Sequence, residues 1–280
     1  MPNSLKIIAE SSATRTEWVI MRGGDIIEHA FTSGMNPYFQ TRRELSHAIR
    51  LELPEVFFKN RYGHVYYYGA GCATTEKKKI MESSLVAQFR SPVNVESDLL
   101  GAARGLFVRD CGIAVILGTG SNSCVYNGEE IIRNVPPLGY VLGDEGSSAY
   151  FGKIFVADVL KGFAPSHIST EFFREYNVSH NMLLNEVYAA VMPSRSLARY
   201  GLFLEKHLED EYVKKLVYDG IMLFFRRNIV AYDYHNCPVR AVGSSAVAFE
   251  RILREVAKDF GVSLENVCRG SMSGLVEYHK

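Results

Sequence analysis

The chain contains two copies of one strand–turn–strand pattern, separated by about a hundred residues in its length of 280. The first copy begins KIIAESSATRT and reaches a glycine turn at Gly23-Gly24. The second begins AVILGTGSNS and reaches a turn at Asn127-Gly128. Each copy predicts an apolar strand, a tight turn of small residues, a second strand and a glycine-containing hairpin. A chain with this internal repeat is predicted to fold as two similar lobes.

The composition is that of an ordinary globular protein, and it argues against several functional classes. Hydrophobic residues make up 47% of the chain, and 31 basic residues balance 31 acidic ones, so no excess of positive charge favours nucleic acid or an anionic membrane. No apolar run approaches the roughly 20 residues of a membrane span, and the N-terminus lacks the pattern of a secretory signal. The five cysteines are scattered without a CxxC pair. This spacing argues against a zinc site or a disulfide framework and favours reduced thiols in a cytoplasmic protein.

Strands and helices alternate along the chain, which predicts an α/β architecture. The N-terminal lobe is predicted over residues 1–108 and the C-terminal lobe over residues 109–280, with a C-terminal helix near 270–280 that packs back on the first lobe. The predicted strands are 5–10, 17–22, 25–30, 64–68, 112–117 and 239–242, with the second hairpin reaching about residue 133. The predicted helices are 41–50, 74–89, one starting at 97 or 98, 146–162, 168–176, 181–191, 195–208, 209–233 and 247–259.

The two small-residue turns are candidate anion sites. Short turns of glycine and hydroxyl residues let successive backbone N–H groups converge on an anion, and Gly118-Thr119-Gly120-Ser121 meets that requirement. In the first turn Glu10 could orient a divalent metal through water, while Thr14 offers a hydroxyl and Arg15 a positive charge. A plain hairpin turn is the alternative for either segment alone. Their repetition favours a shared function, in which the two turns hold a polyphosphate from both sides.

Three further positions have the chemistry of an active site. Asp144 and Glu145 lie between glycines just before a predicted helix, where a carboxylate can hold Mg²⁺ or accept sugar hydroxyls. Asp98 follows a predicted strand and is a candidate general base. The segment Gly243-Ser244-Ser245-Ala246 follows a strand and opens a helix, where α/β folds commonly bind a nucleotide. Helix capping by the carboxylates and a packing role for Gly243 are the structural alternatives.

Taken in order, these motifs resemble the N-acetylglucosamine kinase branch of the actin-like ATPase superfamily, which is grouped with the BadF/BadG/BcrA/BcrD-type ATPases. The resemblance covers most of the chain. It implies two ribonuclease-H-like lobes related by internal duplication, with a cleft between them. It further implies ATP-dependent phosphorylation of an N-acetylglucosamine-like amino sugar, with ATP and Mg²⁺ as cofactors, and a homodimer without nucleic-acid or membrane partners.

The resemblance also assigns roles to individual residues. Asp98, within SDLLGAA, corresponds to the catalytic base, and Glu10 corresponds to the residue that positions Mg²⁺. The positions that correspond to sugar-binding residues are Asn36, Gly71, Ser121, Asn122 and Asp144. The positions that correspond to ATP-binding residues are Ser12, Thr14, Arg15, Gly118, Thr119, Gly120, Gly243, Ser244 and Ala246.

Two alternative functions are also compatible with the sequence. The first turn carries Ser11-Ser12-Ala13 where relatives often have glycines, which is the observation that favours a regulator that binds nucleotide or sugar without turnover. The second alternative is an ATPase that activates acyl-CoA dehydratases, from the same broader family. Those proteins hold an iron–sulfur cluster through cysteines, and no suitable cysteine motif occurs in this sequence.

Overall fold

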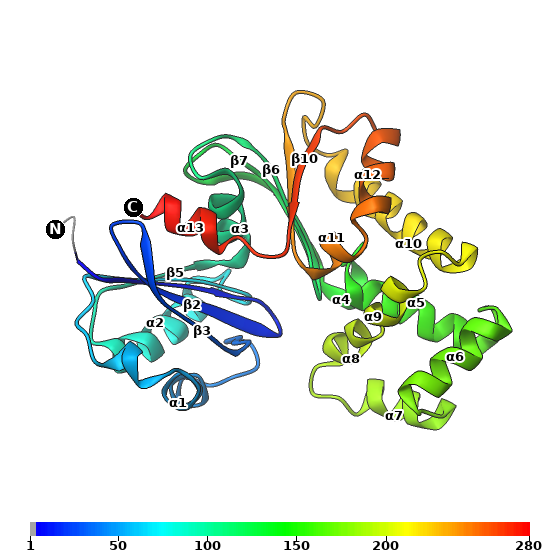
Figure 1. Cartoon of the computed structure of the whole chain (residues 1–280), viewed down its shortest axis with the longest axis horizontal. Coiled ribbons are helices and arrows are strands. Elements are labelled where there is room, and N and C mark those ends of the chain that lie inside the picture. The colour runs from blue at the N-terminus through cyan, green and yellow to red at the C-terminus, as the bar shows by residue number, and fades with distance from the viewer. Residues whose placement is uncertain (1–3) are drawn as a thin grey trace. The chain divides into compact units, whose positions relative to one another are not determined.

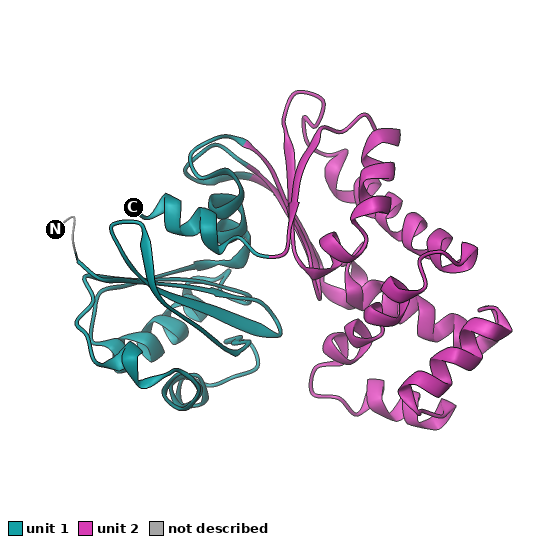
Figure 2. Ribbon diagram, in the orientation of Figure 1, with its two compact units in different colours: residues 1–111, 126–132, 270–280 teal, residues 112–125, 133–269 magenta. Residues whose placement is uncertain are grey.

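The computed structural model describes residues 4–280, which form two compact units. The first unit runs through residue 111 and also includes residues 126–132 and 270–280 (Figure 2). The second unit contains residues 112–125 and 133–269. The C-terminal segment from residue 270 therefore belongs to the first unit.

The two units have sheets with the same strand order. The order is β3-β2-β1-β4-β5 in the first sheet and, read from the opposite edge, β8-β7-β6-β9-β10 in the second. Both orders follow one rule, in which the first strand of the unit is central and its hairpin partners lie on one side. The predicted two-lobed α/β fold with an internal duplication is therefore confirmed.

The first sheet combines antiparallel and parallel pairing. The hairpin strands β1, β2 and β3 pair antiparallel, whereas β4 pairs parallel to β1 and β5 pairs parallel to β4. The strands of this sheet are β1 Lys6–Ser11, β2 Arg15–Arg22, β3 Asp25–Ser33, β4 His64–Gly69 and β5 Val93–Ser97.

Helices cover both faces of the first sheet (Figure 1). One face packs on α1 (Arg42–Glu52) and α2 (Thr75–Phe89), with the short helix η1 (Glu55–Phe58) between them in sequence. The other face packs on α3 (Asp98–Phe107) and α13 (Met272–Tyr278), and it buries Ile8, Val19 and Met21 completely. Because successive side chains of a strand point to opposite faces, Ile7 and Ile8 serve different cores.

Local sequence signals explain where these helices begin. Thr41 and Glu44 form a reciprocal capping box at the start of α1. Thr74 caps α2 and Ser97 caps α3, each by accepting a backbone N–H with its side-chain oxygen. The predicted starts of these three helices are therefore confirmed to within two residues.

The second sheet carries a much larger helical insertion than the first. Strands β9 and β10 run parallel to β6, and the insertion lies between β8 and β9. The strands are β6 Gly112–Leu117, β7 Ser121–Tyr126, β8 Ile131–Val135, β9 Val239–Val242 and β10 Leu264–Cys268. The helices are α4 Gly139–Leu142, α5 Ser148–Lys161, α6 Ser166–Tyr176, α7 His180–Tyr188, α8 Pro193–Arg199, α9 Gly201–Lys206, α10 Glu211–Phe224, η2 Phe225–Ile229, α11 Ser244–Ala248 and α12 Glu250–Asp259.

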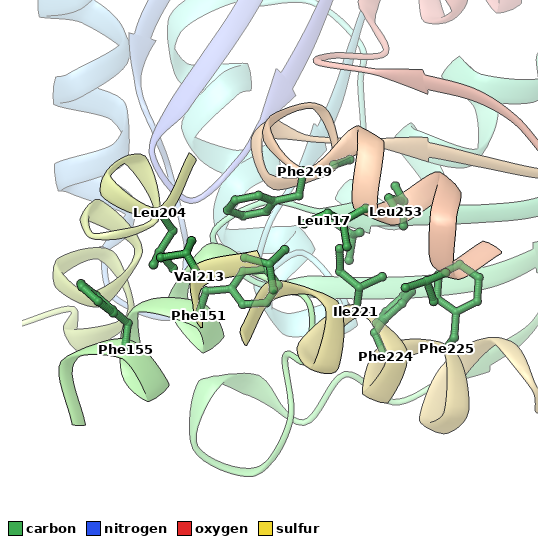
Figure 3. Close-up of a cluster of buried hydrophobic side chains, with 14 of the residues drawn as sticks. Leu117, Phe151, Phe155, Leu204, Val213, Ile221, Phe224, Phe225, Phe249 and Leu253 are labelled. Atoms are coloured by element: carbon green, nitrogen blue, oxygen red, sulfur yellow. The ribbon is translucent and has the colours of Figure 1, made fainter. Parts of the chain in front are cut away.

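A dense aromatic core holds the second unit together. Phe151 meets Phe249 edge to face at 5.0 Å between ring centroids, and Leu117 of β6 lies in the same cluster (Figure 3). Phe155 stacks on Phe203 at 5.3 Å. These contacts fix α5 and α11 near the end of β6, where the glycine-rich turn begins.

Several predicted elements differ from the structure. The predicted helix 195–208 is two helices, α8 and α9, and the predicted helix 247–259 is interrupted at Phe249, whose backbone leaves the helical region (φ −111°, ψ 22°). The predicted helix 209–233 becomes a π-helix after Phe224 and ends at Ile229. Strand β10 was not predicted because LENVC is short and partly exposed.

Candidate active site

In the first unit, the candidate residues gather at the carboxyl end of the three parallel strands. Ser11, Gly69 and Ser97 are in register across β1, β4 and β5. Neighbouring strands lie about 4.8 Å apart, so residues that follow these three positions lie close together. Glu10 precedes the first of them, Gly71 follows the second and Asp98 follows the third.

Buried Ser11 joins this edge to the loop that carries Asn36. Its side-chain oxygen lies 2.7 Å from Thr16 Oγ1 and accepts the Met35 N–H at 3.1 Å. Its carbonyl accepts the Ala70 N–H at 3.0 Å. The serine at this position therefore has a structural function that a glycine could not perform.

Asn36 and Gly71 are in direct contact. A Cβ atom at Gly71 would lie 2.1 Å from Asn36 Oδ1, and its φ of +80° also favours glycine. Asn36 Oδ1 accepts the Tyr38 N–H at 2.9 Å, which fixes the direction of the amide group. The two predicted sugar-binding residues of this unit, Asn36 and Gly71, therefore lie next to each other.

Glu10 is held by Ser271 of the C-terminal segment. Ser271 Oγ donates to Glu10 Oε1 at 2.6 Å, and the Ser271 N–H donates to Oε2 at 3.3 Å. Burial raises the pKa of Glu10, and repulsion from Asp98 acts in the same direction, whereas the bonds from Ser271 lower it. The carboxylate thus has a fixed orientation and retains lone pairs for a further ligand.

Asp98 is the first residue of α3, directly after β5. Its Oδ1 accepts the Leu99 N–H at 2.9 Å, while the helix cap itself is Ser97. Burial raises the pKa of Asp98 above its usual range. Ser97, and not Asp98, therefore caps α3. Asp98 Oδ2 is available to accept a proton.

The first turn, Ser12 to Arg15, is closed by its own side chains. Ser12 Oγ accepts the N–H groups of Thr14 and Arg15, each at 3.3 Å, and the Ser12 N–H donates to the Arg15 carbonyl at 2.9 Å. The Arg15 guanidinium lies 4.2 Å from the centre of the Phe31 ring, on strand β3. The backbone donors of this turn converge on one oxygen atom, as they would on a phosphate oxygen.

In the second unit, the equivalent turn rests on the start of α5. The carbonyls of Gly118 and Thr119 accept the N–H groups of Ser148 and Ala149 at 2.9 and 3.1 Å. A Cβ at Gly118 would have no neighbour closer than 4.0 Å, so the space beside this turn is open. The turn is therefore rigidly supported from one side and accessible from the other.

Asp144 lies against this turn. The Ser121 N–H donates to Asp144 Oδ1 at 3.2 Å, and a Cβ at Gly120 would lie 3.0 Å from Oδ2. Burial raises the pKa of Asp144 to about 6, and its neighbour Glu145 adds to the shift. Glu145 itself accepts a 2.6 Å bond from Arg227 of the π-helix η2.

The segment after β9 closes onto the same turn. A Cβ at Gly243 would lie 2.3 Å from the Leu117 carbonyl oxygen, and its φ is +128°, so this close approach requires glycine. Ser245 Oγ donates to the Gly146 carbonyl at 3.0 Å. Ser244 is exposed at the start of α11, whereas Ala246 is buried in the core.

The candidate residues therefore form one group in each unit. The side chains of two of them, Arg15 and Asn122, are engaged by other residues of their own unit. Arg15 is directed to Phe31. Asn122 Oδ1 accepts bonds from the Ser123 N–H and from Asn134 Nδ2, at 2.9 and 3.0 Å, so its amide is engaged within the sheet.

The donor set suits a metal that is shared with a phosphorylated substrate. Among residues 4–280, no group of three or more histidine, cysteine or acidic side chains is arranged to hold a metal. Mg²⁺ commonly binds through one or two carboxylates together with waters and substrate phosphates. Glu10, oriented by Ser271 and placed beside the first turn, fits that mode.

The sequence alone did not indicate the contact of Ser271 with Glu10 or the ion pair of Glu145 with Arg227. The run GSMSG at 270–274 was the available signal for Ser271, because a Cβ at Gly274 would lie 1.8 Å from the Gly105 carbonyl oxygen. A glycine in such a run permits close approach of two backbone segments because it has no Cβ atom. The run does not indicate which carboxylate the adjacent serine meets.

No protein-family model and no curated protein matches the chain. A solved structure of a candidate N-acetylglucosamine kinase from Porphyromonas gingivalis is similar, with 37% sequence identity, a TM-score of 0.93 and coverage of 98% of each chain. A candidate N-acetylglucosamine kinase from Chromobacterium violaceum shares the fold at a TM-score of 0.77 and 17% identity, over 100% of each chain. A ROK-family glucokinase from Streptomyces griseus, solved with glucose and AMPPNP, has a TM-score of 0.59 and 16% identity, over 98% of this chain and 97% of its own.

These similarities define the class of protein, which is a two-lobed sugar kinase of the actin-like ATPase superfamily. The chain belongs to the N-acetylglucosamine kinase branch of that class, grouped with the BadF/BadG/BcrA/BcrD-type ATPases, as its motifs predicted. Within residues 4–280, no helix has the length and apolar character required to cross a bilayer.

Proposed function

We propose that the protein transfers the γ-phosphoryl group of ATP to a hydroxyl of an amino sugar. The observation that carries the proposal is the group of Asn36, Gly71 and Asp98 at one edge of the first sheet, with Glu10 beside them. A side-chain amide and backbone polar groups can orient a sugar by hydrogen bonds to its hydroxyls. The attacking hydroxyl needs a base that accepts its proton. The similar protein from P. gingivalis supports the choice of an N-acetylglucosamine-like sugar.

In the proposed reaction Asp98 acts as general base. Its Oδ2 accepts the proton of the attacking hydroxyl while the oxygen bonds to the γ-phosphorus and the bond to the β-phosphate oxygen breaks. Asn36 and Asp144 hold the sugar by hydrogen bonds to its other hydroxyl or amide groups. Most of the acceleration in phosphoryl transfer comes from such alignment and from charge stabilisation.

The polyphosphate chain is assigned to the two small-residue turns, with Thr14 on one and Gly118 to Gly120 on the other. Backbone N–H groups at both turns would supply partial positive charge to the phosphates, and Gly118 and Gly120 of the second turn have no Cβ to obstruct them. Bound Mg²⁺ would neutralise charge that develops on the β- and γ-phosphates. Glu10 is the residue assigned to hold that ion, and Gly243 to Ala246 are assigned to the nucleoside.

The test is a product assay with a panel of sugars. The protein is incubated with ATP, Mg²⁺ and, separately, N-acetylglucosamine, glucosamine, N-acetylmannosamine and glucose, and sugar phosphate is measured by mass spectrometry. Phosphorylation of one amino sugar in preference to glucose is expected. Formation of ADP without any sugar phosphate would contradict the proposal.

A second candidate function is a regulator that binds these ligands without turnover. It is favoured by Ser12 Oγ, which already occupies the N–H groups of Thr14 and Arg15. If these donors are not released when ATP binds, the first turn holds the phosphates weakly. Saturable binding of ATP and an amino sugar, with no product after prolonged incubation, would identify a regulator.

A further inference from the structure

We propose that an arginine-lined groove on the first unit binds a small phosphorylated ligand at a site separate from the candidate active site. The groove consists of two adjoining hollows of about 490 and 600 Å³, which share Arg50 and Gln88 in their linings. We call this feature the arginine groove and define it by its basic residues Arg42, Arg43, His47, Arg50, Arg61 and Arg90.

The charge of the arginine groove is not balanced locally. No acidic residue lines either hollow, although the whole chain has equal numbers of basic and acidic residues. Among residues 4–280, none of its five arginines forms an ion pair within 4.0 Å. Clustered guanidinium groups repel one another, and an anion would relieve that repulsion.

Helix stabilisation does not explain the whole cluster. Arg50 and Arg90 lie at the C-terminal ends of α1 and α2, where positive charge is favourable. Arg42 and Arg43 occupy the first turn of α1, where positive charge opposes the helix dipole. Arg61 lies outside any helix. Three of the five arginines therefore have no helix-capping function.

The central arginine is held in place before any ligand binds. The Arg50 guanidinium lies 4.4 Å from the centre of the Phe58 ring, and Phe58 stacks on Phe89 at 5.7 Å. Gln88 is fixed by a 2.6 Å bond from its Nε2 to Ser46 Oγ. Preorganised groups lose less conformational entropy on binding, so this arrangement suits a specific ligand.

The size and the donors of the groove define the class of ligand. One guanidinium group can donate two parallel hydrogen bonds to the oxygens of a phosphate. Hollows of several hundred Å³ match the size of a small molecule. The end of the groove formed by Gln88 and Arg90 is also distant from Gly71 of the candidate active site. Gly71 precedes α2, whereas Gln88 and Arg90 lie at its other end, after a helix of 15 residues that rises about 22 Å.

Calorimetric titration of the full chain tests the proposal, with glucose 6-phosphate, inorganic phosphate and an RNA oligonucleotide as separate probes. The double variant Arg50→Gln, Arg61→Gln is expected to bind the phosphate probes at least about tenfold more weakly, through loss of charge-assisted hydrogen bonds. The control variant Arg22→Gln, Lys161→Gln removes the same charge from exposed positions outside the groove and should bind within about twofold of the native chain. Arg50→Lys keeps the charge without the planar fork and should give an intermediate affinity.

The probes distinguish the possible sources of the phosphate group. Tighter binding of glucose 6-phosphate than of inorganic phosphate would assign a phosphorylated metabolite, and equal binding would assign free phosphate. The proposal is overturned if neither phosphate probe binds saturably, if RNA alone binds, or if the control variant weakens binding as much as the groove variant.

Discussion

At the scale of single residues, Asp144 is a buried carboxylate whose ionisation opposes folding. Its pKa is raised to about 6, and its φ of 59° lies in the left-handed region. Well below pH 4 the group is neutral in both the folded and the unfolded chain. As pH rises from about 4 to 6, only the unfolded chain releases the proton, so the group lowers the stability of the fold by about 2–3 kcal/mol above that window.

We expect Asp144→Asn to stabilise the protein at neutral pH and to impair sugar phosphorylation. Asparagine keeps an acceptor for the Ser121 N–H and tolerates the left-handed conformation. The free energy of unfolding in urea should increase by about 2 kcal/mol at pH 7.5 and hardly at all at pH 4. An equal change at both pH values would show that the charge of Asp144 is not the cause.

Asp98 is the residue on which the proposed chemistry depends. We expect Asp98→Asn to lower kcat by about 10²–10⁴-fold while the dissociation constant for the sugar stays nearly unchanged, because the amide cannot accept the proton. Asp110→Asn, a change of the same kind at an exposed position in the same unit, is the control. Full activity of Asp98→Asn would exclude Asp98 as the base.

The raised pKa of Asp98 also sets the expected pH dependence. The base must be ionised, so kcat/KM should fall as pH decreases through its pKa. An ordinary aspartate has a pKa of about 3.9. Because burial raises the pKa of Asp98, the acidic limb of the profile should lie at higher pH than that value. An acidic limb at or below that value would contradict the assignment.

At the scale of elements, the start of α13 orients the candidate metal ligand. Ser271 donates two hydrogen bonds to Glu10, and residues that orient a metal ligand commonly affect metal affinity by tenfold or more. We expect Ser271→Ala to raise the Mg²⁺ concentration for half-maximal activity by about tenfold. The Mg²⁺-dependent increase in melting temperature with ATP should shift to higher concentration in parallel.

The matched control for this change is Ser273→Ala, two residues further along and exposed. It makes the same substitution near the start of the same helix without touching Glu10. If both variants shift the Mg²⁺ dependence equally, the effect comes from α13 as a whole and not from the bond to the carboxylate.

The elements that the sequence predicted well are those with strong local signals. The hairpin β1–β2 and helices α1 to α3 have alternating apolar residues, tight turns or side-chain caps. The break between α8 and α9 at Tyr200 has no such signal, because Gly201 is there to approach Ser148 rather than to end a helix. A helix break that is caused by tertiary packing cannot be predicted from the local sequence.

At the scale of the whole molecule, the internal repeat predicted the duplication, because each copy encodes the hairpin that starts one of the two sheets; the strand order itself was not predicted. The grouping of Glu10, Asn36 and Asp98 followed from their places at or after the ends of strands and from the family resemblance. The contact of Ser271 with Glu10 joins residues 261 positions apart, and no local pattern specifies such a pair. Long-range contacts of this kind depend on packing between elements.

The C-terminal segment is the part of the molecule whose removal should separate the stabilities of the two units. In α13, Leu275 and Val276 cover Ile8, Val19 and other buried residues of the first sheet, so ending the chain at Arg269 would expose that face. Hydrogen exchange followed by mass spectrometry should show lost protection in β1 and β2, while β6 and β9 keep theirs, because local stability follows local packing. Glu277→Gln, at an exposed position of α13, is the control and should leave both sheets protected. Unchanged protection of β1 and β2 in the shortened chain would show that α3 alone is sufficient to hold this face of the first unit.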